Sequence, residues 1–173
     1  MSIFETARLT AGEIAEADLD DVVAVHLSNP AYLELTEGSA GEPGRYDRGM
    51  LERDLALAGM TPGRHAAALR LRATGECTGV LDWMDENPSD GCPWLGLVMV
   101  HADHQRLGLA TEAVGGLAAH GRRSGWARLR EGVLEENTGG LALARRLGMR
   151  EIDRRPHKIA AGERTLVVFE LRL

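Results

Sequence analysis

The sequence is poor in cysteine, lysine and aromatic residues, and it contains no long hydrophobic run. Its two cysteines, Cys77 and Cys92, have no CxxC or paired-histidine spacing around them, which argues against a metal site. In the expected hairpin of residues 76–84 and 94–101 they lie on the order of 20 Å apart, beyond the roughly 7 Å limit of a disulfide, so we expect free thiols. No apolar run approaches the roughly 18–20 residues of a membrane span, so no transmembrane helix is predicted.

Two further absences restrict location and partners. The N-terminal residues lack a basic region followed by an apolar core, so no secretory signal is predicted and a cytoplasmic protein is expected. The net charge of −6 argues against a general binder of nucleic acid or of anionic membranes. Residues 1–90 hold 17 acids and 7 bases, whereas residues 91–173 hold 9 acids and 13 bases. The acidic first half could therefore favour a cationic ligand and the basic second half an anionic one. The alternative is a chance distribution of solvated surface charge.

The composition is that of an ordinary globular protein, with a single domain expected over residues 1–173. Apolar residues make up 44% and charged residues 27% of the chain. Hydrophobic periodicity and turn signals predict a mixed α/β chain. Strands are expected at Phe4–Leu9, His65–Arg72, Glu76–Met84, Trp94–His101, Arg128–Leu134, Ile152–Ile159 and Arg164–Leu171. Helices are expected at Asp18–Leu27, Tyr46–Ala58, Ala110–Arg123 and Thr138–Leu147, with a loop over Ala31–Gly44.

Residues 97–113 carry the most informative pattern. An apolar strand runs into a polar loop, and Gly108 and Ala110 then open a helix. Such a turn points several unpaired N–H groups at one place and adds the positive end of the helix dipole, which favours a pyrophosphate. The alternative is a plain strand-to-helix connection with a packing glycine. A P-loop is excluded because Lys158 is the only lysine, and GxGxxG is excluded because position 106 is arginine.

The run Gln105-x-x-Gly108-x-Ala110 resembles the acyl-CoA signature Q/R-x-x-G-x-G/A of the GCN5-related N-acetyltransferase (GNAT) superfamily. Asn137, followed by a leucine and by Leu147-Gly148-Met149, resembles the Asn…Leu…Leu-Gly-Phe helix of the same superfamily. The order of the expected elements agrees over nearly the whole chain. The segments 5–9 and 108–113 are also similar to the branch that acetylates the N-termini of ribosomal proteins.

The resemblance implies a central, mostly antiparallel sheet of seven strands flanked by about four helices. Its fourth and fifth strands, 95–101 and 128–134, would run parallel and diverge. The V-shaped slot between them would hold the pantetheine arm of acetyl-CoA, which is the implied acyl donor. No metal is implied, and a homodimer is compatible with the resemblance.

The resemblance also implies which residues bind acetyl-CoA. The arm would pair with the backbone of strand 98–100, the pyrophosphate would bind the N–H groups of the loop, and the asparagine would bond the arm. The 3′-phosphate would meet Arg106, Arg145 or Arg146, although each is equally well a solvated surface arginine. The implied cofactor-binding residues are Val98, Met99, Val100, Gln105, Arg106, Leu107, Gly108, Leu109, Ala110, Thr111, Asn137 and Arg146.

The implied chemistry is direct attack of an amine on the thioester in a ternary complex. The backbone N–H of Met99 or Val100 can polarise the thioester carbonyl. The superfamily often has a tyrosine that protonates the leaving thiolate where this chain has Ala144, and alanine or serine where it has Gly140. Alanine donates no proton, so water or another residue must supply it, or the proton is dispensable.

Asp82 is the candidate base because it lies in the apolar run 80–84, where burying an acid costs free energy unless it is paired or used. Two alternatives are a structural hydrogen bond to the Asn87–Gly91 turn and plain exposure to solvent. Weaker candidates, each more typical of solvated or capping side chains, are Glu135, Glu136, His101 and His104.

The acceptor is expected to be selected by the variable segments. Tyr32, Glu34, Glu37 and Glu42 are candidate acceptor-binding residues, together with the turn at residues 157–162. An acidic wall there suits a cationic amine, either a protein N-terminus or a small amine, whereas a solvated acidic loop is the alternative. The missing tyrosine motivates a second interpretation, a non-catalytic acyl-CoA-binding or regulatory module. Binding of acetyl-CoA without release of its thiol would distinguish this module from an enzyme.

Overall fold

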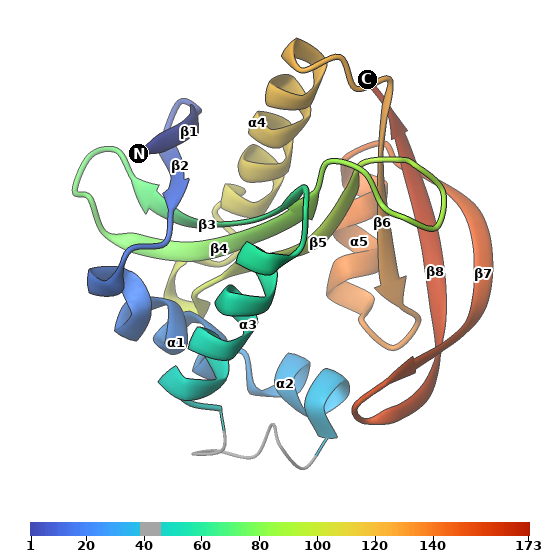
Figure 1. The fold of residues 1–173 in the computed structure, drawn as a ribbon, viewed down its shortest axis with the longest axis horizontal. Helices are drawn as coiled ribbons and strands as arrows, with labels where there is room; N and C mark the ends of the chain where they lie inside the picture. Colours follow the sequence, from blue (N-terminus) through green and yellow to red (C-terminus); the bar gives the residue numbers. More distant parts are fainter. Residues whose placement is uncertain (39–45) are drawn as a thin grey trace.

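The computed structural model describes residues 1–38 and 46–173 (Figure 1). The strands are β1 (Ser2–Glu5), β2 (Leu9–Glu13), β3 (Arg64–Leu71), β4 (Cys77–Met84), β5 (Trp94–Val100), β6 (Arg128–Leu134), β7 (Arg150–Ile159) and β8 (Gly162–Arg172). The helices are α1 (Leu19–Leu27), α2 (Pro30–Glu37), α3 (Arg48–Met60), α4 (Leu109–Arg123) and α5 (Thr138–Arg146), with short 3₁₀ turns η1 (Glu16–Asp18) and η3 (Ala102–His104).

The strands form one mixed sheet with the order β1-β2-β3-β4-β5-β6-β8-β7. Every neighbouring pair is antiparallel except β5 and β6, which run parallel. This confirms the mixed α/β class and the mostly antiparallel sheet that the sequence predicts. The described residues form eight strands rather than seven, and five α-helices rather than about four.

Helices cover both faces of the sheet because successive strand residues point to opposite sides. On β4, Val80 packs in one cluster with Val22 of α1 and Leu51 of α3, whereas Leu81 packs in another with Leu117 of α4. Figure 1 shows α1 and α3 in front of the sheet and α4 behind it. None of the helices in the described ranges is both long and apolar enough to cross a membrane.

The N-terminal segment is a hairpin, so the single strand predicted at Phe4–Leu9 is wrong. β1 and β2 pair antiparallel, and the turn between them is held by two hydrogen bonds. The N–H of Thr6 donates to the carbonyl of Leu9, and the N–H of Leu9 donates back to Thr6 Oγ1. β2 reads Leu-Thr-Ala-Gly-Glu, with one large apolar residue, so hydrophobic alternation does not reveal it.

The loop predicted at Ala31–Gly44 is wrong over its first part, where the chain forms α2. Asn29 and Pro30 do end α1, as expected, but they also begin the next helix with Asn29 at the N-cap and Pro30 at the first helical position. Proline is favoured there because its missing N–H has no helical partner to lose. Residues 39–44 of that predicted loop lie outside the described residues.

β5 and β6 pair at only two positions, Trp94 with Arg130 and Leu95 with Glu131. Beyond them β5 continues along β4 to Val100, and β6 continues along β8 as far as the end of the strand. The two strands therefore diverge toward their C-terminal ends (Figure 1). This confirms the predicted separation and places its apex at Leu95 and Glu131.

Candidate active site

A cavity of about 210 Å³, which we call the slot, lies where β5 and β6 diverge. Leu97 and Val98 of β5 and Gly132 of β6 are among its lining residues. It reaches Asn137 at the start of α5 and also Tyr32 of α2. These two helices lie on opposite faces of β6, because α5 packs in the cluster of Val133 and α2 in the cluster of the next residue, Leu134. The slot thus connects the two faces of the sheet.

The loop that follows β5 contains two residues in the left-handed conformation. Arg106 has φ 66° and is the only non-glycine with a positive φ in the described residues, and Gly108, the N-cap of α4, has φ 79°. Backbone of this kind turns successive N–H groups toward one point, and a left-handed arginine persists only where its surroundings hold it. The helix begins at Leu109, so its first free N–H groups lie beside the loop. Clustered N–H groups of this kind suit an anion, and the pyrophosphate at this loop stays a prediction.

Arg8, in the turn between β1 and β2, contacts both the loop that follows β5 and the first turn of α4. Its Nη1 donates to the carbonyl of Leu107 at 2.9 Å, and its Nε lies 2.6 Å from Oε2 of Glu112 in the first turn of α4. Burial by itself raises the pKa of Glu112, but hydrogen bonds from Thr6 and Arg8 outweigh it and lower that pKa, so the carboxylate stays charged. Apart from the resemblance of segment 5–9, nothing in the sequence around Arg8 indicates this role.

The edge of β5 that faces the slot presents alternate backbone groups. The N–H of His101 donates to the carbonyl of Thr78 on β4. Because backbone groups alternate along a strand, the amide of Met99 also points toward β4, and the amides of Val98 and Val100 point toward the slot. Val98 lines the slot and the amide of Val100 faces it. The amide of Met99, the other predicted partner of the thioester carbonyl, is instead directed at β4.

The carbonyl of Val100 is already satisfied within the protein. It accepts from Nε2 of Gln105 at 2.9 Å and from Nδ2 of Asn29 at 3.1 Å. Gln105 Nε2 also donates to Asn29 Oδ1 at 2.7 Å. Nε2 of Gln105, a predicted cofactor-binding residue, therefore fixes the end of β5 and is not available to a ligand.

Asn137 and Gly140 shape the α5 side of the slot. Oδ1 of Asn137 accepts the N–H of Gly140 at 2.9 Å. A Cβ on Gly140 would lie 2.7 Å from Asn137 Nδ2 and 2.8 Å from Val133 Cγ1, which explains why glycine replaces the expected alanine or serine. One turn later, Ala144 is fully buried in a cluster with Val133 and Phe169. The side chain at position 144 therefore has no proton to give to a leaving thiolate.

The remaining predicted cofactor residues lie around the loop and at the end of α5. Leu107 is exposed, whereas the side chain of Leu109 is buried in the core. Ala110 and Thr111 are half-buried in the first turn of α4, and the pair Arg145-Arg146 is exposed in the last turn of α5. β5 and Asn137 thus line the slot, whereas residues 105–111 are not among its lining residues. Leu109 can offer a ligand only its backbone.

Asp82 lies on the face covered by α1 and α3 and belongs to an ion-pair network. Its Oδ2 is 3.0 Å from Nη2 of Arg64, and the same nitrogen is 3.1 Å from Oδ1 of Asp54. Burial raises the pKa of Asp82, and the neighbouring guanidinium only partly opposes this rise. The predicted alternative, a hydrogen bond to the Asn87–Gly91 turn, is wrong because the partner is Arg64 on the adjacent strand.

A bulge in β5 brings Asp82 to the slot. The register passes from Asp82 opposite Leu97 to Trp83 opposite Leu95, so Gly96 is the extra residue. Asp82 and Gly96 both line a cavity of about 290 Å³, and Gly96 also lines the slot. The carboxyl group of Asp82 therefore lies at the mouth of the slot on the side away from α4.

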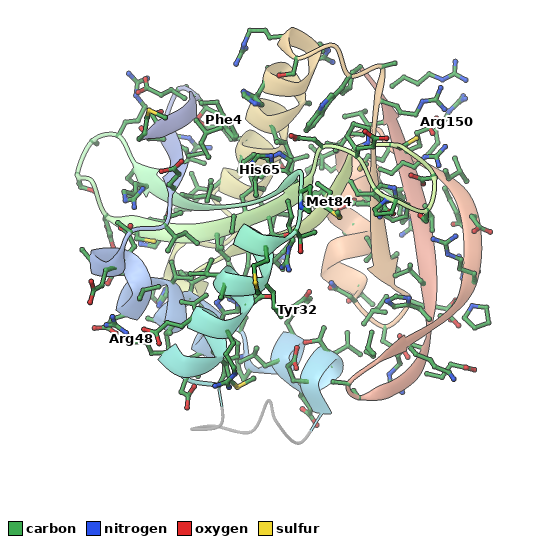
Figure 2. The ribbon with its side chains drawn as sticks, viewed as in Figure 1. Phe4, Tyr32, Arg48, His65, Met84 and Arg150 are labelled. Carbon is green, nitrogen blue, oxygen red and sulfur yellow. The ribbon has the colours of Figure 1, made fainter. Side chains whose placement is uncertain are left out.

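A third cavity of about 350 Å³ adjoins this side, beneath α2 and α3. Tyr32 and Glu37, two predicted acceptor-binding residues, line it together with Asp54, and Figure 2 shows Tyr32 between α2 and the sheet. Glu34 is exposed and lines neither the slot nor the two adjoining cavities. Glu42 lies outside the described residues. From the predicted 157–162 turn, His157 and Ile159 line the slot.

His26 is a further residue on this side, and its helical spacing in the sequence indicates only a buried helix face. It is 8% exposed and lines both cavities beside Asp82. Its Nδ1 is 2.9 Å from the carbonyl of Val22, so the neutral ring carries its proton on Nδ1 and can accept one on Nε2. Burial lowers the pKa of His26, and its ring stacks on Tyr46 with centroids 4.6 Å apart.

Glu131 is a second residue that the sequence does not single out. It is 7% exposed, it lines the slot, and its Oε1 has no hydrogen-bond partner in the described residues. Burial raises the pKa of Glu131 to about 7. In the sequence it is one charge among several in Arg128–Leu134, and only the parallel pairing with β5 places it inside the protein.

The weaker candidates have partners typical of surface and capping side chains. His101 accepts from the N–H of Asp103 as the N-cap of η3. The other pairs are His104 with Glu76 at 3.1 Å, Glu136 with Arg164 at 3.6 Å, and Glu135 with Arg154.

The strands β5 and β6 run parallel and diverge, a loop over residues 101–108, which we call the anion-binding loop, follows β5, and a cavity lined by Asp54 and Asp82 lies on the other face. This arrangement is typical of an acyl-CoA-dependent transferase. The family model described as an acetyltransferase (GNAT) domain matches residues 8–150, and the chain belongs to this family. Its activity is acetyl-CoA-dependent acetylation. None of the curated proteins compared matches the chain.

Solved acetyltransferases share this fold over nearly their whole length. An acetyltransferase from Thermus thermophilus is 25% identical, with 100% of both chains covered and a TM-score of 0.73. A Salmonella typhimurium enzyme that modifies the N-terminal serine of ribosomal protein L7/L12 is 15% identical, with 97% of this chain and 96% of that chain covered and a TM-score of 0.76. The microcin C7 self-immunity acetyltransferase MccE, solved with acetyl-CoA and AMP, is 12% identical, with 96% and 93% covered and a TM-score of 0.77.

Proposed function

We propose that the protein transfers the acetyl group of acetyl-CoA to a primary amine by direct attack in a ternary complex. One observation carries this proposal: the slot joins a face that bears the anion-binding loop to a face that bears acidic cavities. A donor and an acceptor can therefore meet in it from opposite sides. Neither Cys77 nor Cys92 lines the slot, which favours direct attack over an acyl-cysteine intermediate.

The donor is proposed to lie along the free edge of β5. The amides of Val98 and Val100 face the slot and supply the hydrogen bonds that hold the arm and polarise the thioester carbonyl. The N–H groups of residues 106–110 bind the pyrophosphate, with Arg8 holding the loop in shape. Asn137 contacts the arm from α5, and Arg146 is positioned near the end of that helix for the 3′-phosphate.

The acceptor is proposed to enter from the side of Asp82. Glu37, Asp54 and Asp82 line the adjoining cavities and outnumber the two arginines there, Arg53 and Arg64. The remaining negative charge favours a protonated amine on arrival. Asp82 then takes the amine proton, and His26 is the second group in these cavities able to do so. A terminal amine, with a pKa near 8, needs less help than a lysine near 10.4. We therefore favour a protein or peptide N-terminus, and the likeness to the Salmonella enzyme supports this choice.

The test measures thiol release from acetyl-CoA with matched acceptors, together with the mass of each product. One peptide that contains lysine is offered with a free N-terminus and with a blocked one, and a polyamine represents small amines. The proposal expects acetylation only of the free N-terminus. Turnover of the polyamine alone would mean that the acceptor is a small amine and not a protein or peptide N-terminus. Binding of acetyl-CoA without turnover of any amine would contradict the proposed function.

A further inference from the structure

Glu131 occupies the apex of the slot. It is the last residue of β6 that pairs with β5, opposite Leu95, and on its other side it pairs with Phe169 of β8. Beyond it the two strands separate. A side chain at this position therefore lies where the slot closes, at the end farthest from the anion-binding loop.

The carboxyl group of Glu131 faces the donor side of the sheet. Its neighbours two residues away, Leu129 and Val133, are both buried, and they pack with α4 and α5 respectively. Because residues i and i+2 of a strand share a face, Glu131 lies between these two clusters. Arg130, on the opposite face, pairs with Asp90 and Glu170 and does not neutralise it.

This carboxyl group is energetically costly. Its side chain is 7% exposed, and Oε1 has no hydrogen-bond partner among residues 1–38 and 46–173. A buried polar atom without a partner destabilises a protein by an amount comparable to a lost hydrogen bond or more. Leucine or valine would pack at this position without that cost, so the glutamate is best explained by a use in the slot.

The donor arm, placed as proposed above, brings its sulfur toward this carboxyl group. The pyrophosphate site lies past Val100, and the arm runs back along β5 toward the apex. From Val100 to Leu95 the strand covers about 17 Å at about 3.3 Å per residue, comparable to an extended pantetheine arm. Glu131 and the β5 residues Leu95 to Val98 line the same cavity.

The slot also lacks a proton donor at the α5 position where the superfamily often has a tyrosine. Ala144 is buried against Val133, the strand neighbour of Glu131 on the same face. We propose that Glu131 is the general acid that protonates the leaving thiolate of CoA, supplying from β6 the proton that Ala144 cannot supply. This inference rests on the proposed acetyl transfer.

The step balances without any further reactant. The amine nitrogen forms a C–N bond to the acetyl carbonyl carbon, and the C–S bond breaks with its electron pair on sulfur. The proton of the Glu131 carboxyl group passes to that sulfur and gives the free thiol of CoA. The nitrogen loses its proton on the acceptor side, and the Glu131 carboxylate regains one from water after the products leave.

The protonation state of Glu131 suits this role. Burial raises its pKa to about 7, so part of the protein carries the acid form at neutral pH. A thiolate whose thiol has an ordinary pKa, about 8.5, accepts a proton from such an acid favourably. The titratable groups that share the slot are Tyr32 from α2 and His157 from β7, while the lining residues of β5, α5 and β8 are neutral.

The test compares Glu131→Gln with the wild type using saturating acetyl-CoA and an amine that the wild type acetylates. Glutamine keeps the shape of the side chain but does not release a proton. We expect kcat near neutral pH to fall at least about tenfold, or about 1.4 kcal/mol, with the KM for acetyl-CoA within about twofold. Since only the wild type loses its acid with rising pH, the wild-type to variant ratio of kcat should fall as pH rises above about 7.

Two further variants keep the result interpretable. Glu16→Gln is the matched control, because Glu16 is on η1 and its side chain is 90% exposed. Glu131→Leu removes the unpartnered carboxyl and should lose kcat equally while melting at a higher temperature. Unchanged kcat in Glu131→Gln and Glu131→Leu, a ratio independent of pH, or a loss confined to acetyl-CoA affinity would each overturn the assignment. A wild type inactive toward every amine would instead overturn the proposed function.

Discussion

Asp82 and Gly96 approach so closely that a β-carbon at Gly96 would lie 2.7 Å from Oδ1 of Asp82. Gly96 is the bulged residue of β5, and it lines both the slot and the cavity that contains Asp82. The glycine therefore lets the carboxyl group lie against the backbone of the strand that is proposed to carry the donor. This contact links the candidate base on β4 to the reacting end of the slot.

Asp82→Asn should impair transfer much more than donor binding. If Asp82 takes the amine proton, kcat/KM should fall by about a hundred- to ten-thousand-fold, as is usual for the loss of a general base. The affinity for acetyl-CoA should stay the same, because the donor is proposed to bind on the other face. Steady-state kinetics with titration calorimetry of acetyl-CoA check both expectations.

Asp85→Asn is the matched control for this variant. Asp85 follows β4, lies 2.8 Å from Nε2 of His65 and accepts from Nε1 of Trp83. The substitution therefore also alters a hydrogen-bonded carboxylate, but one outside the slot. It should leave kcat/KM within a few-fold of the wild type. A lowered melting temperature with near-normal kinetics in Asp82→Asn would mean that Asp82 serves its pair with Arg64 rather than the reaction.

The sequence predicts a helix or strand correctly where hydrophobic periodicity is strong. It misses elements that depend on pairing with a neighbouring strand or on a proline at the start of a helix. Strand 128–134 has the predicted bounds, and α4 begins within one residue of the prediction, because apolar spacing and a terminal glycine mark them. β2 has only one large apolar residue, and it forms a strand because it pairs with β1 and β3. α2 begins at Pro30, a residue that also reads as a helix stop.

The candidate site shows the same division. The loop at Gly108 is predictable because its conformation is a local property of the chain. The contacts of Arg8 with Leu107 and Glu112 join residues about a hundred positions apart, which no local pattern reveals. Likewise, the burial of Glu131 depends on the pairing of β6 with β5, and the access of His26 to the cavities depends on how α1 packs against the sheet.

Gly108→Glu should weaken acetyl-CoA binding by about tenfold or more, which corresponds to about 1.4 kcal/mol. Its φ of 79° strains any side chain, and the added carboxylate would repel a pyrophosphate at the loop. The dissociation constant of acetyl-CoA measures the effect. Gly125→Glu, at φ 87° beyond the other end of α4, introduces a similar strain and charge and should leave binding unchanged. Equal affinities of the two variants for acetyl-CoA would contradict the assignment of the loop at Gly108 as the pyrophosphate site.

The stability of the protein should fall with rising pH because of Glu131. Its folded-state pKa of about 7 exceeds the ordinary value of 4.5, so the folded protein retains a proton that the unfolded chain releases. The free energy of unfolding therefore declines between about pH 4.5 and pH 7 and loses on the order of 3 kcal/mol from this group. Glu131→Gln should lack this decline. Urea unfolding of both proteins near pH 5 and pH 8 measures it, and parallel changes in the two would contradict a buried titrating carboxyl group.

Ala144→Tyr should not increase turnover. The position lies in a closed cluster with Val133, Met149 and Phe169, so a phenol ring must displace packed side chains, which typically costs about 1–3 kcal/mol. If Glu131 already protonates the thiolate, the added hydroxyl supplies nothing that the slot lacks. We expect kcat at saturating acetyl-CoA to be equal or lower, with a reduced melting temperature. A severalfold higher kcat without loss of stability would show that thiolate protonation limits the wild type and that no other group, Glu131 included, performs it efficiently.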